Sequence, residues 1–228
     1  MSKKIVAIII CAIVSLSIVG CGKKDEKADN TSKAKTATEE QYDKLEGEWA
    51  KDTTLDDLKT KYNDLLKSVE EKTKGYGLEY TKDETVKEEN SETVNHNNIY
   101  LDNKNAEKNR LESLYFGMKI FGEKLSTGQI TMKLSLNFDG EDALKTGKFD
   151  FGETSLASYS ALLTNEKDRD YKEINSKIID ILNSESGEGV IKSSINGLYE
   201  EFTVHKDYIV YKLETKVFDF IKPVEETK

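Results

Sequence analysis

The chain has 228 residues, of which 34 are Lys or Arg and 43 are Asp or Glu, and its formal net charge is −9 at pH 7. A net negative charge argues against nucleic acid as a partner and against electrostatic attachment to anionic lipid. The only cysteines are Cys11 and Cys21, which argues against a disulfide framework and against a cysteine-rich zinc site.

The N-terminal residues have the layout of an export signal. Two lysines precede an apolar run over residues 5–19, which is shorter than the roughly 20 residues of a membrane-spanning helix. The run ends at Ile18-Val19-Gly20-Cys21, which resembles the lipobox of bacterial lipoproteins. The resemblance implies cleavage before Cys21, diacylation of its sulfur, and anchoring in the cell membrane with the chain on the extracytoplasmic side.

The residue usage adds to this resemblance. Lysine greatly exceeds arginine, which occurs only as Arg110 and Arg169, and the chain has a single proline. Together with the lipobox, this composition resembles that of surface lipoproteins from low-GC Gram-positive bacteria. Gly22 stands where an aspartate would retain a lipoprotein in the inner membrane of a Gram-negative cell, so a Gram-negative outer-membrane lipoprotein is the alternative.

The chain is divided by composition. We predict a signal peptide over residues 1–20, then a tether that begins at the lipidated Cys21 and extends to residue 40. The tether has no aliphatic residue larger than alanine, so it buries too little apolar surface to offset the entropy of ordering, and we expect it to be disordered. A single domain is predicted over residues 41–222, followed by a charged tail at residues 223–228.

The first strong periodicity predicts a helix from about Thr54 to Gly75. Thr54 and Asp57 resemble a capping box, and Gly75 with Gly77 indicates where the helix ends. The apolar stripe of the helix consists of Leu55, Leu58, Tyr62, Leu65, Leu66 and Val69. A shorter amphipathic segment precedes it, with apolar residues Tyr42, Leu45 and Trp49.

Residues 82–110 are rich in Asn, Glu and Lys and predict only one or two weak strands with loops. Alternating residues over 112–138 then predict an antiparallel hairpin with a loop at Gly122–Gly128. A one-residue slip would place Met118 opposite a polar residue, so the faces are strongly specified. The expected pairs are Ile120 with Ile130, Met118 with Met132, Phe116 with Leu134, and Leu114 with Leu136.

Two helices and a second hairpin follow. The first helix opens at Thr154 or Ser155, and the second closes near Gly187. Their apolar residues are Leu156, Tyr159, Leu162 and Leu163 in the first, and Tyr171, Ile174, Ile178, Ile181 and Leu182 in the second. Residues 197–218 predict a hairpin with its tip at Lys206-Asp207. Its expected pairs are Val204 with Ile209, Phe202 with Tyr211, and Glu201 with Lys212.

These elements predict an α+β fold. We expect one antiparallel sheet of about five strands, built from the hairpins at about 112–138 and 197–218, with helices packed on one face. The sequence contains no convincing internal repeat, although two hairpins that flank a helical pair leave room for one.

Three short motifs are interpreted as local structure. Asp150-Phe151-Gly152 lacks the accompanying kinase motifs, and we expect Phe149 and Phe151 to pack a strand. Lys145-Thr146-Gly147 has no Ser-x-x-Lys partner in the mature chain outside the tether, so it indicates a turn. Asp139–Asp142 lacks the 12-residue spacing of an EF-hand loop and indicates a turn or the start of a helix.

Catalysis and metal binding find little support in the sequence. The two histidines, His96 and His205, are isolated from other ligand residues, whereas a zinc site uses three or four ligands. No serine has the context of an activated nucleophile, and lipidation would consume Cys21. We therefore expect no enzymatic activity, no metal and no cofactor.

The aromatic residues of the last hairpin form a candidate binding surface. Phe202 and Tyr211 should belong to the core. The residues of opposite parity are Tyr199, Tyr208, Phe218 and Phe220. Exposed aromatic rings are typical of surfaces that bind protein or glycan. A second helical layer over this face would explain them equally well.

The expected function is that of a lipid-anchored binding or interaction module in the cell envelope. It would contact the membrane through acylated Cys21 and would bind an envelope protein or a glycan, but no nucleic acid. Two alternatives stay open: an accessory subunit of a membrane complex, and a carboxylate-dependent envelope hydrolase, since some of the 43 acidic residues lie close together by chance.

Overall fold

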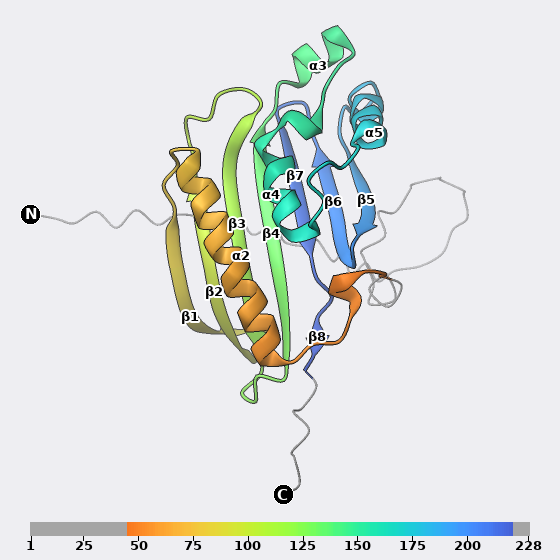
Figure 1. Cartoon of the computed structure of the whole chain (residues 1–228). Helices are drawn as coiled ribbons and strands as arrows, with labels where there is room; N and C mark the ends of the chain where they lie inside the picture. Colours follow the sequence, from red (N-terminus) through yellow and green to blue (C-terminus); the bar gives the residue numbers. More distant parts are fainter. Residues whose placement is uncertain (1–44, 221–228) are drawn as a thin grey trace, which may run out of the picture. The chain divides into compact units, whose positions relative to one another are not determined.

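The computed structural model describes residues 45–220 (Figure 1). The predicted signal peptide, Cys21, the tether, the charged tail and both predicted domain boundaries lie outside these residues. The described elements are η1 (Glu48–Ala50), α2 (Leu55–Gly75), β1 (Thr81–Glu89), β2 (Glu92–Asp102), β3 (Arg110–Phe121), β4 (Thr127–Asn137), α3 (Gly140–Thr146), η2 (Phe151–Glu153), α4 (Ser155–Thr164), α5 (Lys172–Leu182), β5 (Gly189–Ile195), β6 (Leu198–Val204), β7 (Tyr208–Glu214) and β8 (Phe218–Asp219).

Eight strands form one sheet in which all neighbours are antiparallel. Their order is β1-β2-β3-β4-β7-β6-β5, and β8 pairs with β4. The meander β1–β4 and the meander β5–β7 meet where β4 pairs with β7. The predicted α+β fold with an antiparallel sheet is confirmed, but the prediction of about five strands is wrong.

The strands that the sequence did not clearly indicate are β1, β2 and β5. They lack the apolar alternation that identified the two hairpins. β1 is an edge strand rich in charged residues, and its Val86 is 66% exposed. Charges on an edge strand hinder pairing with other chains, and an edge strand buries little surface. β2 turns Asn97 toward α2, where the Asn97 carbonyl oxygen accepts a hydrogen bond from the Tyr62 hydroxyl at 2.7 Å. β5 forms the opposite edge and carries the exposed Val190.

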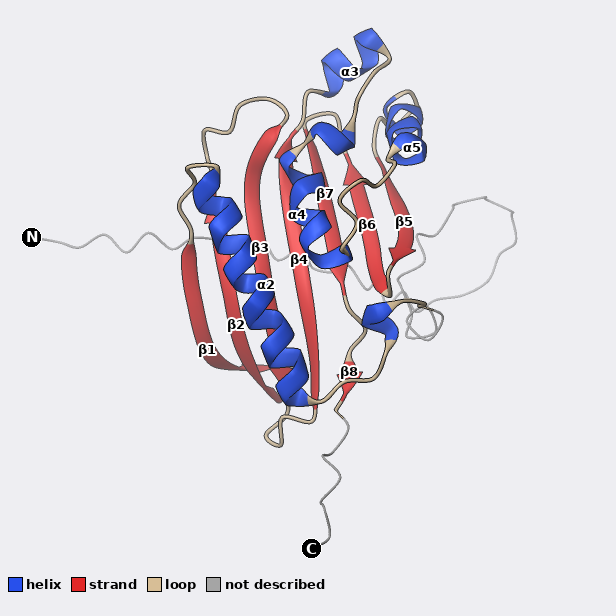
Figure 2. Cartoon of the chain, viewed as in Figure 1, coloured by secondary structure: helices blue, strands red, loops and turns tan. Residues whose placement is uncertain are grey.

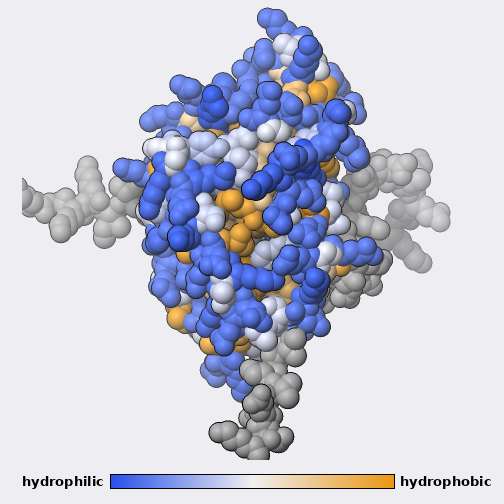
Figure 3. All heavy atoms as spheres, in the orientation of Figure 1, coloured by the Kyte–Doolittle hydropathy of each residue, from blue (hydrophilic) through white to orange (hydrophobic). Residues whose placement is uncertain are grey.

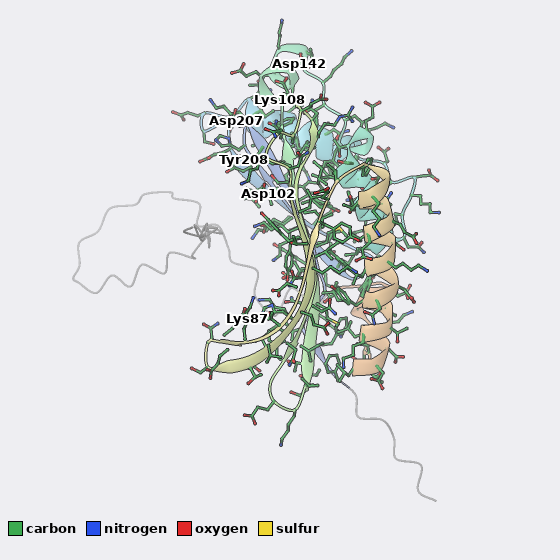
Figure 4. The ribbon with its side chains drawn as sticks, turned by 90° about the vertical axis from the view of Figure 1, so that its left-hand side faces the viewer. Lys87, Asp102, Lys108, Asp142, Asp207 and Tyr208 are labelled. Atoms are coloured by element: carbon green, nitrogen blue, oxygen red, sulfur yellow. The ribbon has the colours of Figure 1, made fainter. Side chains whose placement is uncertain are left out.

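Helices α2, α4 and α5 lie on one face of the sheet, and α3 lies at its end (Figures 2 and 4). α2 and α4 contact β3 and β4, whereas α5 contacts β5 and β6. The core lies between these helices and the sheet, and within residues 45–220 no helix covers the opposite face (Figure 4). The largest side chains in the core are those of Tyr62, Tyr159, Tyr211, Phe116, Phe138, Phe151 and Phe202.

The helix predicted over 54–75 is confirmed, and its ends follow the expected capping chemistry. Thr54 Oγ1 accepts a hydrogen bond from the backbone N–H of Asp57 at 3.1 Å. Gly77 follows the helix with a φ of +69°, a left-handed conformation that costs glycine little. The expected helices α4 and α5 are also confirmed, with Thr154 as the N-cap of α4, but α5 ends at Leu182 and not near Gly187.

The first predicted hairpin has the correct faces but the wrong register. Its pairs are Met118 with Ile130, Phe116 with Met132, and Leu114 with Leu134, a shift of two residues from the prediction. The strands extend to Phe121 and Thr127, so Gly128 belongs to β4 instead of the loop. The second hairpin has the predicted register in full, with Val204, Phe202 and Glu201 opposite their expected partners.

Gly128 explains the error in the first hairpin. It pairs with Ile120, although matching apolar side chains predicted Ile130 there. A Cβ atom on Gly128 would lie 2.6 Å from Phe220 Cζ, 2.7 Å from Ile120 Cδ1 and 3.2 Å from Leu58 Cδ2. Three apolar side chains therefore cover the glycine, and the rule that apolar residues pair across a hairpin fails at this position.

The turn between β5 and β6 contacts the first described residues. Asn196 and Gly197 both have positive φ, 50° and 82°, as the tight turn of a hairpin requires. The Asn196 carbonyl oxygen accepts a hydrogen bond from Trp49 N at 3.1 Å. The indole N–H of Trp49 donates to the Leu163 carbonyl oxygen at 2.8 Å. The segment that contains η1 is thereby joined to α4 and to the edge of the sheet.

Candidate functional site

A cleft of about 990 Å³ opens at the end of the sheet beside α3. It lies between the β2–β3 loop, the linker from α3 to η2, and α5. Figure 4 places Lys108 of the β2–β3 loop and Asp142 of α3 at this end of the sheet. The lining consists of Lys108, Asn109, Arg110, Gly147, Lys148, Phe149, Asp150, Glu153, Thr154, Lys172, Asn175, Ser176, Ile179 and Asp180.

One wall of the cleft is a face of α5. The residues on this wall recur every three or four positions, which places them on one side of a helix. They are Lys172, Asn175, Ser176, Ile179 and Asp180. The buried side of the same helix carries Ile174, Ile178 and Leu182. Because the apolar side is fixed in the core, the mixed side faces the cleft in a defined orientation.

Asn175 joins this wall to the linker that forms the floor. Its Oδ1 accepts a hydrogen bond from Phe151 N at 2.9 Å, and its Nδ2 donates to Asp150 Oδ1 at 3.1 Å. The Phe151 ring is buried against Tyr171, Phe202 and Tyr211, at centroid distances of 5.0, 5.0 and 5.2 Å. Phe149 and Phe151 themselves lie in the linker and in the 3₁₀ turn η2, and Phe151 packs against strands β6 and β7, as expected of a residue that packs a strand.

The opposite wall is tied to the end of β4. Lys108 Nζ donates a hydrogen bond to the Phe138 carbonyl oxygen at 3.1 Å. Asn109 Oδ1 accepts one from Asp139 N at 3.0 Å. In the floor, the half-buried Phe149 ring meets the Phe138 ring edge-on at 4.8 Å. These contacts give the β2–β3 loop a definite position over the floor.

The charged side chains of the cleft have both signs. The cations are Lys108, Arg110, Lys148 and Lys172, and the carboxylates are Asp150, Glu153 and Asp180. Within residues 45–220, only Lys172 among them forms an ion pair, with Asp170 at 3.2 Å. The other charged groups have no ionic neighbour in the described chain, although Lys108 and Asp150 are held by hydrogen bonds to Phe138 and to Gly152 and Asn175.

The aromatic residues predicted as a binding surface do not come together. Tyr208, at the turn between β6 and β7, is 39% exposed, and its ring stacks on His205 at 4.8 Å. Tyr199 is only 5% exposed and Phe218 only 2%, so these two rings do not contribute to an exposed aromatic surface. Phe220 is half-buried against the core.

Phe218 and Tyr199 are buried for different reasons. β7 ends at Glu214, and the irregular residues 215–217 reset the alternation of faces before β8 begins. Phe218 then pairs with Gly128 of β4 and packs into the core. Tyr199 keeps the predicted face, but its strand has paired neighbours on both sides, β5 and β7, which leaves its ring little contact with solvent.

A buried ionic cluster lies between the α4–α5 linker and the sheet. Glu200 is fully buried, and its two carboxylate oxygens accept hydrogen bonds from Arg169 Nη1 and Nη2 at 2.5 and 2.8 Å. They also accept hydrogen bonds from the Tyr211 hydroxyl at 2.7 Å and the Ser193 hydroxyl at 2.6 Å. Ser160, also fully buried, lies 2.7 Å from the same Tyr211 hydroxyl.

The protonation states of the cluster follow from these contacts. Burial raises the pKa of Tyr211 well above its usual value, so the phenol stays neutral and donates. Burial lowers the pKa of Arg169, but the hydrogen bonds and charge of Glu200 raise it by more, so the guanidinium stays charged. Glu200 alternates with the core residues Phe202 and Val204 on β6, and this parity is the sequence signal that would have identified a buried acid.

The histidines lie far apart in the chain. His96 on β2 is almost buried, with Nε2 at 3.0 Å from Glu89 Oε1, and Lys119 Nζ donates to Glu89 Oε2 at 2.9 Å. Burial and the positive charge of Lys119 lower the pKa of His96, so its ring is neutral at pH 7. His205 lies at the β6–β7 turn. Residues 45–220 contain no group of three or more His, Cys, Asp or Glu side chains that could hold a metal ion.

The two short acidic and basic motifs near α3 are structural, as predicted. Asp139 is the N-cap of α3, and its Oδ1 accepts a hydrogen bond from Asp142 N at 3.1 Å. Gly147 ends the same helix with a φ of +66°. The interpretation of Asp139–Asp142 as a helix start is confirmed, whereas Lys145 and Thr146 are the last residues of α3 and only Gly147 lies in a turn.

Comparison with known proteins gives no relative: no protein-family model, curated protein or solved structure matches this chain. Among residues 45–220, no helix has both the length and the apolar character needed to cross a membrane.

Sequence reasoning did not identify the cleft. Its lining comes from three separate segments, and each has the polar composition of an ordinary protein surface. The one available signal was the second face of α5. In that face Ile179 interrupts an otherwise hydrophilic stripe, which is unusual for a helix side that only meets solvent.

Proposed function

We propose that this protein is a lipid-anchored binding module of the cell envelope, and that its ligand occupies the cleft beside α5. The observation that carries the proposal is the cleft itself. It has a volume of about 990 Å³, walls fixed by hydrogen bonds, and charged groups without ionic neighbours in the described chain. Sites for small ligands typically measure about 300–1,000 Å³, so a ligand of small-molecule size fits.

The sequence supports the anchored part of the proposal. Ile18–Cys21 resembles a lipobox, and a diacylated Cys21 would carry two hydrocarbon chains. Each buried methylene contributes about 0.8 kcal/mol, and two chains hold a protein on a bilayer where one gives only marginal binding. Residues 21–40 then form a tether between the lipid and the domain.

Surface composition favours a binding module over an accessory subunit. A subunit that packs against membrane proteins would leave a continuous apolar face in the isolated chain. Figure 3 shows mainly hydrophilic residues on the face that carries the helices. The exposed large apolar residues of the described chain come from separate elements and are Tyr76, Val86, Leu144, Val190, Tyr208 and Val217.

Binding is also favoured over hydrolysis. Around Glu200 the described chain brings hydroxyl, phenol and carboxylate groups to hydrogen-bonding distance: the half-buried Ser193 bonds to Glu200, whereas Ser160, Tyr211 and Glu200 itself are fully buried. A substrate would have no access to these buried groups. In the cleft, the Asp150 carboxylate is held by the Gly152 amide and by Asn175, as expected of a structural group.

The proposal is tested by blocking the cleft. Ser176 is an exposed residue on the cleft side of α5, and Ser176→Trp would fill part of the cleft without disturbing the core. Glu173→Trp is the matched control, because Glu173 is exposed on α5 outside the cleft lining. Both variants of the detergent-solubilised full chain would be screened by thermal shift against amino acids, small phosphorylated compounds and neutral oligosaccharides.

We expect at least one compound class to raise the melting temperature of the wild type and of Glu173→Trp, but not of Ser176→Trp. A compound that stabilises all three forms equally binds elsewhere and would contradict the assignment of the cleft.

A further inference from the structure

The two arginines of this chain have contrasting environments. In a chain that otherwise uses lysine, Arg169 stands where a buried carboxylate requires two parallel N–H donors, and it holds Glu200 at 2.5 and 2.8 Å. The planar guanidinium makes this two-point contact and a lysine ammonium cannot. Arg169 thus binds an oxyanion, the Glu200 carboxylate, through two hydrogen bonds.

Arg110, the second arginine, is exposed at the start of β3 and lines the cleft. Among residues 45–220 it forms no ion pair and its side chain donates no hydrogen bond. The cations Lys108 and Lys148 line the same cleft. The loop that precedes Arg110 is held in place, since Asn109 Oδ1 accepts a hydrogen bond from Asp139 N and Lys108 donates one to the Phe138 carbonyl oxygen.

We propose that Arg110, with Lys108 and Lys148, binds a phosphate or carboxylate group of the ligand. This inference rests on the proposed function and gives its ligand a chemical class. Oxyanions accept charge-assisted hydrogen bonds from the forked guanidinium, and the two ammonium groups that line the same cleft add attraction. The backbone of the β2–β3 loop, already tied to β4, supplies the rigidity that a specific contact needs.

The carboxylates of the cleft limit the charge of the ligand. Asp150, Glu153 and Asp180 line the same space as the four cations, and the whole chain carries a formal charge of −9. A polyanion would be repelled by both. The ligand is therefore a small molecule with one oxyanionic group, and its remainder is neutral or carries a positive charge toward the carboxylates.

The test is a titration of the full chain in detergent, monitored by the chemical shifts of backbone amides in NMR spectra. Three probes are titrated in separate experiments. The probes are inorganic phosphate, acetate and phosphoethanolamine, which bears one phosphate and one ammonium group. Wild type would be compared with Arg110→Gln, Arg110→Lys and the control Lys124→Gln. Lys124 is exposed in the β3–β4 loop at the other end of the sheet and is in no ion pair within the described chain.

We expect saturable binding, with shifts concentrated at residues 108–110, 147–154 and 172–180. Arg110→Gln should weaken it at least about tenfold, which corresponds to the loss of one charge-assisted hydrogen bond. Arg110→Lys should weaken it by less, and Lys124→Gln by less than about twofold. If the phosphate-bearing probes saturate the site and acetate does not, the ligand group is a phosphate. If acetate saturates it and the phosphate-bearing probes do not, the group is a carboxylate.

Two results would overturn the inference: no saturable binding of any probe, or equal affinity in Arg110→Gln and wild type. Either is distinguishable from failure of the proposed function. If a neutral compound still binds wild type and Glu173→Trp but not Ser176→Trp, the cleft remains the ligand site and only the oxyanion is rejected.

Discussion

At the scale of single residues, the burial of the Glu200 carboxylate depends on its pairing with Arg169. The carboxylate of Glu200 is fully buried, and its hydrogen bonds come from Arg169, Tyr211 and Ser193. Taking a carboxylate out of water costs several kcal/mol unless it is paired and hydrogen-bonded. The guanidinium, at 14% exposure, is the only cationic partner that the described chain places on Glu200.

Arg169→Met should therefore destabilise the fold by about 3–5 kcal/mol, because it leaves a buried charge without its counterion. Chemical denaturation of the two forms measures the difference. The matched control is Arg110→Met, which removes the other, exposed arginine and should change stability by less than about 0.5 kcal/mol. Equal losses of unfolding free energy in the two variants would mean that the buried Arg169–Glu200 pair stabilises the fold no more than the exposed Arg110 does.

At the scale of elements, the hairpins show which part of a register argument is robust. In β3 and β4 the faces were predicted correctly, since Met118, Phe116, Met132 and Leu134 all point into the core. The register was displaced by two residues because both registers satisfy the same alternation. The tip of the hairpin decides between them, and there Gly128 makes room for Phe220, the residue that follows β8.

Met132→Lys should destabilise the domain by about 2–5 kcal/mol, since it replaces a fully buried apolar side chain opposite Phe116 with a charge. Lys133→Met, one residue along on the exposed face, should change stability by less than about 0.5 kcal/mol. The midpoints of urea denaturation provide the comparison. If both variants lose the same stability, the assignment of the faces is incorrect.

At the scale of the whole molecule, the proposed function combines two structurally independent parts, the membrane anchor and the binding cleft. The anchor depends on a short peptide motif around Cys21, which lies outside the described residues. The cleft depends on α5, the α3–η2 linker and the β2–β3 loop, which only the folded domain brings together. Loss of the anchor should therefore leave binding intact, and loss of the cleft should leave the anchor intact.

Cys21→Ala should move the protein from the membrane fraction to the medium, or leave the uncut precursor, because no sulfur remains to be acylated. Cell fractionation with immunodetection, together with the intact mass of the wild-type protein, provides the measurement. Cys11→Ala is the control and should stay with the membrane, since that cysteine lies in the predicted signal peptide. An unmodified Cys21 in the wild-type mass would refute the anchor.

Part of the site was within reach of sequence reasoning and part was not. The polar face of α5 follows from its periodicity, and Glu200 shares the parity of Phe202, so both have a local signature. The meeting of Arg110, Lys148 and Asn175 has none, because these residues are 38 and 27 positions apart along the chain. No local pattern predicts that three such segments share one end of a sheet.

What the sequence determined by itself is what depends on near neighbours. Helix α2 with its caps, helices α4 and α5, the register of the β6–β7 hairpin, and the lipobox resemblance all arise from residues a few positions apart. The tertiary structure decided the number of strands, the burial of Phe218 and the existence of the cleft. These depend on contacts between distant segments, such as β8 on β4 and Asn175 on Phe151, whose free energy appears only when the whole sheet is assembled.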